Sequence, residues 1–312
     1  MKRIFLLFTL LCFPFSLTWA ANPNVVNGVA TYNANKNIGT KFPVPNSWKQ
    51  IKINAGVKIT GSFFVQQGTR TTNNLSVIGK NRNTSLIVGA GPHDHNGTAQ
   101  AREKSAIRYF GPGTLTVKKL TSKNSVKFHI SGQNKVVVTN ATIIQPDGEV
   151  TSDGVHGKQN SGSVVKGSRI DVYDDATYIT ETKTIQNTTI VHNRNGSPFQ
   201  IGWGNRLFTG QKTAVISGVT VQSASTGYNQ GVVSWAHNQH SAANNTVNVK
   251  FSNQLKRTKK SGAAHAPMVQ LGTRRFTTNK GVINVLGTGS CQWKNSIQRY
   301  NGSNSKVNFR NC

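Results

Sequence analysis

The chain has 312 residues, of which 37 are lysine or arginine and 9 are aspartate or glutamate, so its formal net charge is +28. Its hydrophobic fraction of 36% is ordinary, which argues against disorder and against a coiled coil. Asparagine occurs 34 times and glycine 30 times, whereas glutamate occurs only 3 times, and this poverty in helix formers favours an all-β protein.

The first predicted element is a secretory signal peptide over residues 1–20. Lys2 and Arg3 precede the uncharged run Ile4–Trp19, and Ala20 offers a small residue for cleavage. That run is short for a membrane span, and no later stretch approaches the roughly 20 apolar residues that a spanning helix needs. We therefore predict cleavage after Ala20, no membrane span, and a secreted or periplasmic protein.

Residues 21–312 are predicted to form one catalytic domain built from repeated strands. Residues 21–50 contain three prolines and little periodicity, so we expect them to cap the first coil. Beyond them, short runs of alternating apolar residues recur. These runs are 75–79, 86–89, 114–117, 136–143, 164–170, 184–190, 215–221, 246–249 and 282–285. The charged segments 92–106 and 255–267 lack this pattern and are predicted as loops outside the repeats.

Four of the runs share a bend residue in their middle. The bends are Asn140, Gly167, Asn187 and Gly218, separated by 27, 20 and 31 residues. Glycine and asparagine tolerate the left-handed backbone conformation that a sharp bend requires. A constant pattern with a variable period predicts stacked coils joined by loops, that is, a single-domain right-handed parallel β-helix. The alternative, a β-sandwich with irregular loops, explains the strands but not the repeated bend.

Two cysteines remain after the signal peptide and its Cys12 are removed. In an exported protein, Cys291 and Cys312 are predicted to form a disulfide that closes the C-terminal loop. The alternative is a pair of free buried thiols.

The acidic residues are concentrated in one part of the sequence. All nine lie between Asp94 and Glu181, and six fall within residues 147–175. Adjacent Asp174 and Asp175 repel each other, which raises the pKa of at least one of them unless something compensates. The alternative reading is that such acids are turn residues at coil corners.

The spacing of these acids matches one coil of the predicted solenoid. Asp153 precedes Asp174 by 21 residues, so stacking about 4.8 Å apart would place Asp153 beside the pair. Because adjacent strand residues point to opposite faces, Asp174 and Asp175 can share a cleft only if the chain bends there. Glycosidic hydrolysis uses such a set of carboxyls, one to protonate the leaving oxygen and one to activate water.

These motifs resemble those of known β-helix glycosidases. The run 151–154 (Thr-Ser-Asp-Gly) followed by 174–176 (Asp-Asp-Ala) is similar to the paired signature of polygalacturonases and of the dextranase and isopullulanase family. The run 195–203 resembles the dextranase branch more than the pectin branch, whose Gly-His-Gly is missing. The resemblance implies that Asp174 is the general acid, that Asp153 and Asp175 hold the water, that the anomeric carbon is inverted, and that no metal or other cofactor is required.

Several residues near the acids are candidates for substrate binding. Aromatic side chains stack on sugar rings, and a histidine or an amide can bind a hydroxyl. Four histidines, His156, His192, His237 and His240, are considered, of which His192 is preferred. The predicted substrate-binding residues are Tyr173, His192, Gln200, Trp203 and Trp235. His93-Asp94-His95 has metal-like spacing but lacks a third ligand, so we predict no metal there.

The leading hypothesis is therefore an endo-acting, inverting polysaccharide hydrolase, with an α-glucan such as dextran or pullulan favoured as substrate. The basic surface predicts non-specific attraction to polyanions, but no motif for specific nucleic-acid recognition accompanies it. Two alternatives stay open: a non-catalytic β-helix adhesin or glycan-binding protein, and a hydrolase or calcium-dependent lyase of an acidic polysaccharide.

Overall fold

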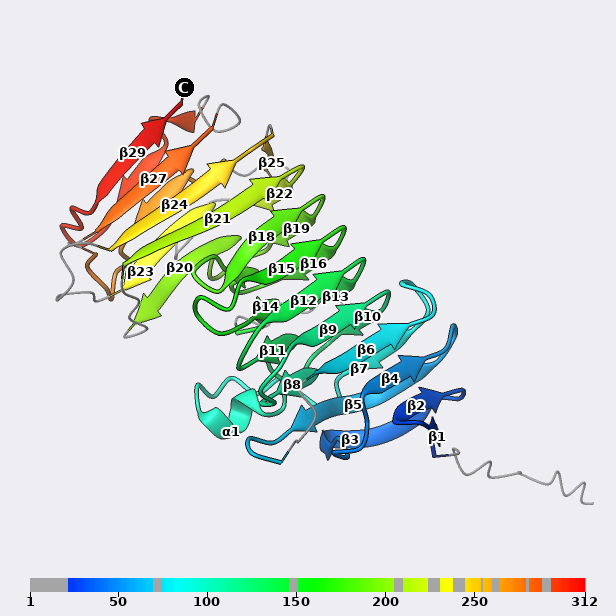
Figure 1. The fold of residues 1–312 in the computed structure, drawn as a ribbon. Coiled ribbons are helices and arrows are strands. Elements are labelled where there is room, and N and C mark those ends of the chain that lie inside the picture. The colour runs from blue at the N-terminus through cyan, green and yellow to red at the C-terminus, as the bar shows by residue number, and fades with distance from the viewer. Residues whose placement is uncertain are drawn as a thin grey trace, which may run out of the picture.

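The computed structural model describes residues 22–69, 74–145, 151–204, 210–223, 231–237, 245–253, 255–259, 264–278, 281–287 and 293–311. They form an elongated stack of parallel strands, with the chain ascending from one end to the other (Figure 1). The predicted parallel β-helix is confirmed, and the β-sandwich alternative is excluded. The residues of the predicted signal peptide and of the predicted disulfide, Cys291 and Cys312, lie outside the described residues.

Three ladders of strands run along the stack. The first comprises β1 (Asn24–Val26), β2 (Val29–Tyr32), β4 (Gln50–Ile53), β6 (Leu75–Gly79), β9 (Leu115–Lys118), β12 (Val136–Thr139), β15 (Ser163–Lys166), β18 (Thr182–Gln186), β21 (Gln211–Ser217), β24 (Thr246–Phe251), β27 (Val282–Leu286) and β29 (Lys306–Arg310). The second comprises β3 (Lys36–Pro43), β5 (Lys58–Val65), β7 (Leu86–Val88), β10 (Thr121–Lys123), β13 (Thr142–Ile144), β16 (Arg169–Val172), β19 (Thr189–His192), β22 (Thr220–Ser223) and β25 (Lys256–Thr258). The third comprises β8 (Ile107–Tyr109), β11 (Ile130–Gly132), β14 (Val155–His156), β17 (Thr177–Tyr178), β20 (Phe199–Gly204), β23 (Val233–His237), β26 (Val269–Leu271) and β28 (Ile297–Arg299).

The second and third ladders meet at β5, which pairs with β7 through its first half and with β8 through its second half. Inward-facing apolar side chains stack from coil to coil. Ile143, Ile170 and Ile190 occupy equivalent positions on β13, β16 and β19 and are fully buried. Each coil therefore buries its apolar face against its neighbours, which is how a solenoid builds a continuous core.

The bends between the first and second ladders are where the sequence predicts them. Asn140, Gly167, Asn187 and Gly218 all have left-handed backbones, with φ values of 51°, 56°, 46° and 60°. They stack on one another, because the Gly167 N–H donates to Gln186 O and the Asn187 N–H donates to Ser217 O, each at 2.9 Å. The repeated bend is thus one turn type carried through four successive coils.

Two expectations about the edges of the solenoid are corrected. The segment predicted as a cap, 21–50, is not simply a cap, because β2 already pairs in parallel with β4; among the described strands, β1 is the one that pairs antiparallel. Within 255–267, β25 pairs in parallel with β22, so part of the predicted loop is a strand. Its two outer residues are exposed, and Arg257 lies over the Trp293 ring at 5.6 Å, which lets a charged segment continue the ladder.

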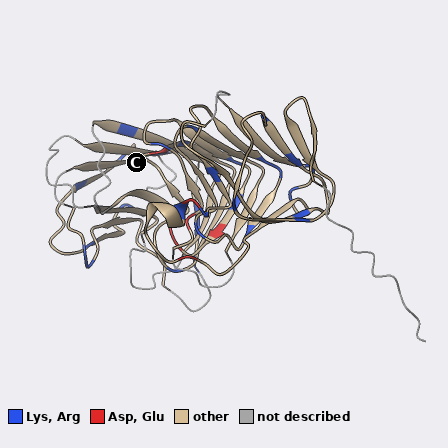
Figure 2. Ribbon diagram, turned by 90° about the horizontal axis from the view of Figure 1, so that it is seen from below, with Lys and Arg blue, Asp and Glu red and all other residues tan. Residues whose placement is uncertain are grey.

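The other charged segment, 92–106, does lie beside the stack and contains the short helix α1 (Ala99–Arg102). No helix in the described part of the chain is long and apolar enough to cross a membrane. Figure 2 shows the acidic residues gathered in one region, whereas lysine and arginine are spread over the molecule.

Candidate active site

The acidic site lies in the turns that connect the second ladder to the third. Asp153 lies two residues before β14, and Asp174 and Asp175 lie between β16 and β17, one coil further along. The two turns are stacked, because the Gly154 N–H donates to Asp175 O at 2.9 Å. The one-coil separation expected from the spacing is therefore observed.

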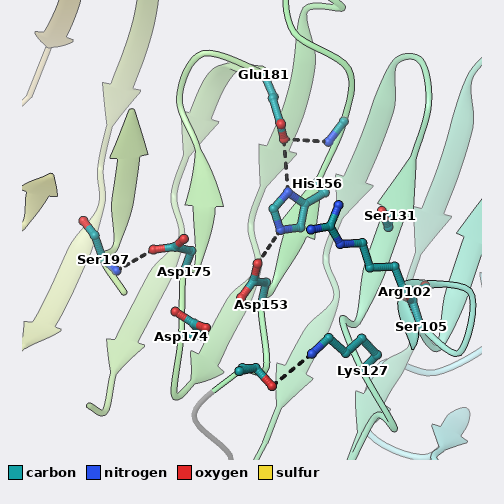
Figure 3. A network of polar contacts seen from close by, with 12 residues as sticks. Arg102, Ser105, Lys127, Ser131, Asp153, His156, Asp174, Asp175, Glu181 and Ser197 are labelled. Carbon is teal, nitrogen blue, oxygen red and sulfur yellow. Dashed lines mark hydrogen bonds and ion pairs between the residues drawn. The ribbon is translucent and has the colours of Figure 1, made fainter. Parts of the chain in front are cut away.

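The backbone bends at Asp174, so the two adjacent aspartates are not forced onto opposite faces of a strand. One carboxylate oxygen from each of Asp153, Asp174 and Asp175 lies within 4.8 Å of the other two. Asp153 and Asp175 are 5% and 4% exposed, and Asp174 is half-buried. Figure 3 shows the three aspartates close together, with the Asp175 carboxylate directed toward Ser197.

Asp153 is held by a buried histidine. His156 Nε2 lies 2.6 Å from Asp153 Oδ2, and Nδ1 lies 3.3 Å from Glu181 Oε2, which also accepts from the Gly157 N–H at 3.1 Å. Burial lowers the pKa of His156, but its contacts with the two carboxylates outweigh burial, so the pKa is raised overall. This arrangement favours an imidazolium at His156.

The other two carboxyls have raised pKa values. Burial, followed by the charges of Asp153 and Asp175, raises the pKa of Asp174 well above its usual range. Burial and the charge of Asp153 raise the pKa of Asp175 to about 7, although hydrogen bonds from Tyr178 and from the Ser197 N–H, the latter at 2.8 Å, oppose the shift.

The proton on Asp174 has a natural acceptor. Asp153 Oδ1 is buried and has no hydrogen-bond donor among the described residues when every carboxyl is ionised. A protonated Asp174 beside it would supply that donor and relieve the repulsion between the two groups. The raised pKa of Asp174 and its contact with Asp153 place the two carboxyls in unequal environments, and acid and base catalysis require such a difference.

The next coil closes the site through a glycine. Gly196 has a φ of 65°, and a Cβ at this position would lie 2.5 Å from Oδ1 of both Asp174 and Asp175. Asn195 Nδ2 donates to Asp174 Oδ1 at 3.2 Å. The turn can approach the carboxylates this closely only because residue 196 has no side chain.

A buried lysine, Lys127, lies on the side of the carboxylates opposite the Gly196 turn. Lys127 is 2% exposed, and its Nζ donates to Asp94 O at 2.8 Å and to Thr151 Oγ1 at 3.1 Å. Burial lowers its pKa, and the charges of Asp153, Asp94 and Asp174 oppose that change. Lys127 thus places a buried amine of lowered pKa near the carboxylates.

The sequence did not single out Lys127 or Glu181, and His156 was only one of four histidines considered. The position of His156 three residues after Asp153 was the available signal. Of the other three, the preferred His192 is fully buried between Ser223 Oγ and Asn195 O, His240 lies outside the described residues, and of His237 only the backbone is described.

The predicted substrate-binding residues divide into two groups. Gln200 and Trp235, like His192, are fully buried, so none of the three has an exposed surface with which to contact a polymer. Trp203 is half-buried and packs edge-on against Phe276 at 4.9 Å. Tyr173 is half-buried in the same turn as Asp174. Tyr173 and Trp203 thus keep the exposure that a sugar contact needs.

The three convergent carboxylates offer the oxygen ligands that a hard cation such as Ca²⁺ prefers. The His93 motif is less suited to a metal, because the ring nitrogens of His93 already contact Ser125 O and Thr151 Oγ1, while Asp94 pairs with Lys104.

Comparisons of the chain with protein-family models, with curated proteins and with solved structures gave no match. The functional argument therefore rests on the site itself.

Proposed function

We propose that the protein is an exported, endo-acting glycoside hydrolase that cleaves a polysaccharide at the Asp153, Asp174 and Asp175 site. The observation that supports this is the convergence of three carboxylates in unequal environments, with one oxygen of each within 4.8 Å of the others. The likeness of the two aspartate motifs to dextranases and polygalacturonases supports the same chemistry. It also favours an α-glucan as substrate, with an acidic polysaccharide as the alternative.

In the proposed reaction, Asp174 gives its proton to the leaving glycosidic oxygen. Asp153, which is hydrogen-bonded to His156, acts with Asp175 to orient the attacking water and accept its proton. Inversion follows from the resemblance, yet the oxygens lie closer than the roughly 6.5–9.5 Å that commonly separates the two carboxyls of inverting enzymes. The anomer released first, observed by proton NMR during cleavage, decides between inversion and retention.

The first experiment measures release of reducing ends from dextran, pullulan, polygalacturonate, alginate and hyaluronan by the wild type and by Asp174→Asn. We expect cleavage by the wild type and a loss of at least about 100-fold in Asp174→Asn, because general acid catalysis contributes 10²–10⁴-fold. Binding of a glycan without cleavage by the wild type would instead support the adhesin.

A second candidate function is a polysaccharide lyase. The close oxygens could hold Ca²⁺, and the buried Lys127 with its lowered pKa could act as the base that such an elimination needs. A lyase would release unsaturated uronates that absorb in the ultraviolet, and a chelator would abolish its activity. A hydrolase would release saturated products and would tolerate the chelator.

A further inference from the structure

An arginine beside the acid site lacks a partner in the described structure. Arg102 ends helix α1 and is half-buried. Its Nε is buried without a hydrogen-bond acceptor, and its guanidinium makes no ion pair with any described residue. Because a buried charge without a partner is unfavourable, guanidinium groups in such places are normally paired.

The charged neighbours of Arg102 are all engaged elsewhere. Glu103 pairs with Lys41 at 2.5 Å, and Lys104 pairs with Asp94 at 2.6 Å. Arg102 is therefore the one member of this three-residue charged run whose charge is unmatched within the described part of the chain.

The backbone holds Arg102 in a fixed place. The Arg102 N–H donates to Thr98 O at 3.2 Å, Ser105 Oγ donates to Arg102 O at 2.6 Å, and Ala106 N–H donates to Phe128 O at 3.0 Å on the solenoid. Ala101 and Ser105, on either side, are buried. These contacts hold the Arg102 backbone in a defined position, so its side chain extends from a rigid part of the structure.

The side chain extends toward the catalytic network. Figure 3 shows the guanidinium directed at His156, on the same side of the carboxylates as Lys127. Arg102 is near enough to Lys127 for its charge to contribute to the lowered pKa of that lysine. Two cations thus flank one edge of the site, but Lys127 is almost fully buried and already bonded, which leaves Arg102 as the group able to meet a ligand.

We propose that Arg102 binds an anionic group, a carboxylate or a sulfate, on the glycan that occupies the acid site. The planar, forked donors of a guanidinium match the paired oxygens of both anions. This inference rests on the proposed function for the position of the glycan, and it makes a charged polysaccharide, rather than a neutral α-glucan, the substrate class.

The test measures binding by titration calorimetry in the Asp174→Asn background, so that nothing is cleaved. The probes are two matched pairs: dextran sulfate with dextran for the sulfate, and oligogalacturonate with its carboxyl-reduced form for the carboxylate. We expect one charged member to bind more tightly than its neutral partner. Arg102→Gln should remove about 10- to 100-fold of that affinity without affecting the neutral partner.

Two further variants make the result specific. Lys118→Gln removes one exposed positive charge from β9 on the first ladder and should leave the preference intact. Arg102→Lys keeps the charge without the fork and should bind with intermediate affinity. Equal binding of charged and neutral probes, an unchanged preference in Arg102→Gln, or no binding of any probe would each overturn the proposal.

This design separates the two proposals. If the wild type cleaves no polymer but an Arg102-dependent preference is found, hydrolysis fails and the anion site stands. If the wild type cleaves dextran and shows no preference for a charged probe, the anion site fails and hydrolysis stands.

Discussion

Asp174 and Asp175 are placed where ionisation is unfavourable, and this has a consequence for stability that does not depend on the substrate. An aspartate in the unfolded chain ionises near pH 3.8, whereas Asp175 in the fold ionises near pH 7. The unfolded state therefore releases its proton first, and the free energy of unfolding falls as the pH rises from about 4 through about 7. His156, whose pKa is also raised, contributes in the same direction.

We therefore expect Asp175→Asn to be more stable than the wild type at pH 8, by up to roughly 4 kcal/mol, and to lose that advantage near pH 4.5. Urea unfolding at the two pH values measures this. Asp171→Asn is the matched control, because Asp171 lies on the same coil but pairs with Arg169 at 2.6 Å. A gain at pH 8 that persists at pH 4.5 would contradict the assignment.

The raised pKa of Asp174 also predicts the form of the activity profile. Because the proposed acid must be protonated, kcat/KM should fall on the alkaline side, at a pH well above the ordinary aspartate range. On the acidic side it should fall as Asp175, whose pKa is about 7, gains a proton. The charge of His156 lowers the pKa of Asp175, so His156→Gln, which cannot carry charge, should move the acidic limb to higher pH. An unchanged acidic limb would contradict the coupling of His156 to the base.

Gly196 tests the packing of the carboxylates directly. A left-handed backbone costs an alanine about 1–2 kcal/mol wherever it occurs, so Gly196→Ala and Gly162→Ala should share that loss. Gly162 has a φ of 67° with nothing within 4 Å of a Cβ, whereas the Cβ at 196 would meet two carboxylates. Only Gly196→Ala should lose most of the catalytic activity in the reducing-end assay. Equal activity in the two variants would show that the close approach is not needed.

Sequence alone could predict the three aspartates but not the residues around them. Asp153 and Asp174 are one repeat apart, and stacking converts that interval into proximity. Glu181 lies after β17 on the coil of Asp174, and Lys127 precedes β11 on an earlier coil; each is about one repeat from its partner, but the sequence pattern does not say that their side chains turn toward the site. His192 shows the reverse error, since a histidine after a repeated strand can equally point inward, and this one is buried.

At the scale of the element, the left-handed bends are the feature that sequence predicts best, because only glycine and asparagine fit them easily. They also allow a substitution to be designed. A Cβ at Gly167 would have open space, with Asn140 N at 4.0 Å as its nearest neighbour, and its stacked neighbours are Asn140 and Asn187.

Gly167→Asn should therefore be within about 0.5 kcal/mol of the wild type or more stable, because asparagine tolerates the bend and restricts the unfolded chain. Gly167→Ala should lose about 1 kcal/mol from the same backbone strain. Urea unfolding of the two variants distinguishes them, and equal stabilities would contradict the conformational argument.

Strand β25 shows why some elements were missed. Lys256 and Thr258 face solvent and Arg257 spreads over an aromatic ring, so the segment has the period of a strand without apolar residues. Its pairing with β22 is set by the ladder beneath it, which sequence patterning does not report. The conformation of β25 is therefore set by its pairing with a neighbouring coil, whereas the conformation of the bends is set by the local preference of glycine and asparagine.

At the scale of the whole molecule, the charge is distributed unevenly: the net charge is +28, but the acids gather at the site (Figure 2). The net positive charge attracts an anionic polymer over long distances, and added salt screens this attraction. The proposed contact between Arg102 and an anion acts only at short range. For a charged substrate, kcat/KM should therefore fall by about tenfold or more between about 20 mM and 500 mM NaCl. Cleavage of neutral dextran should change by less than about twofold, because no long-range attraction is lost. Equal salt dependence for both polymers, measured by release of reducing ends, would mean that the basic surface takes no part in capturing the substrate.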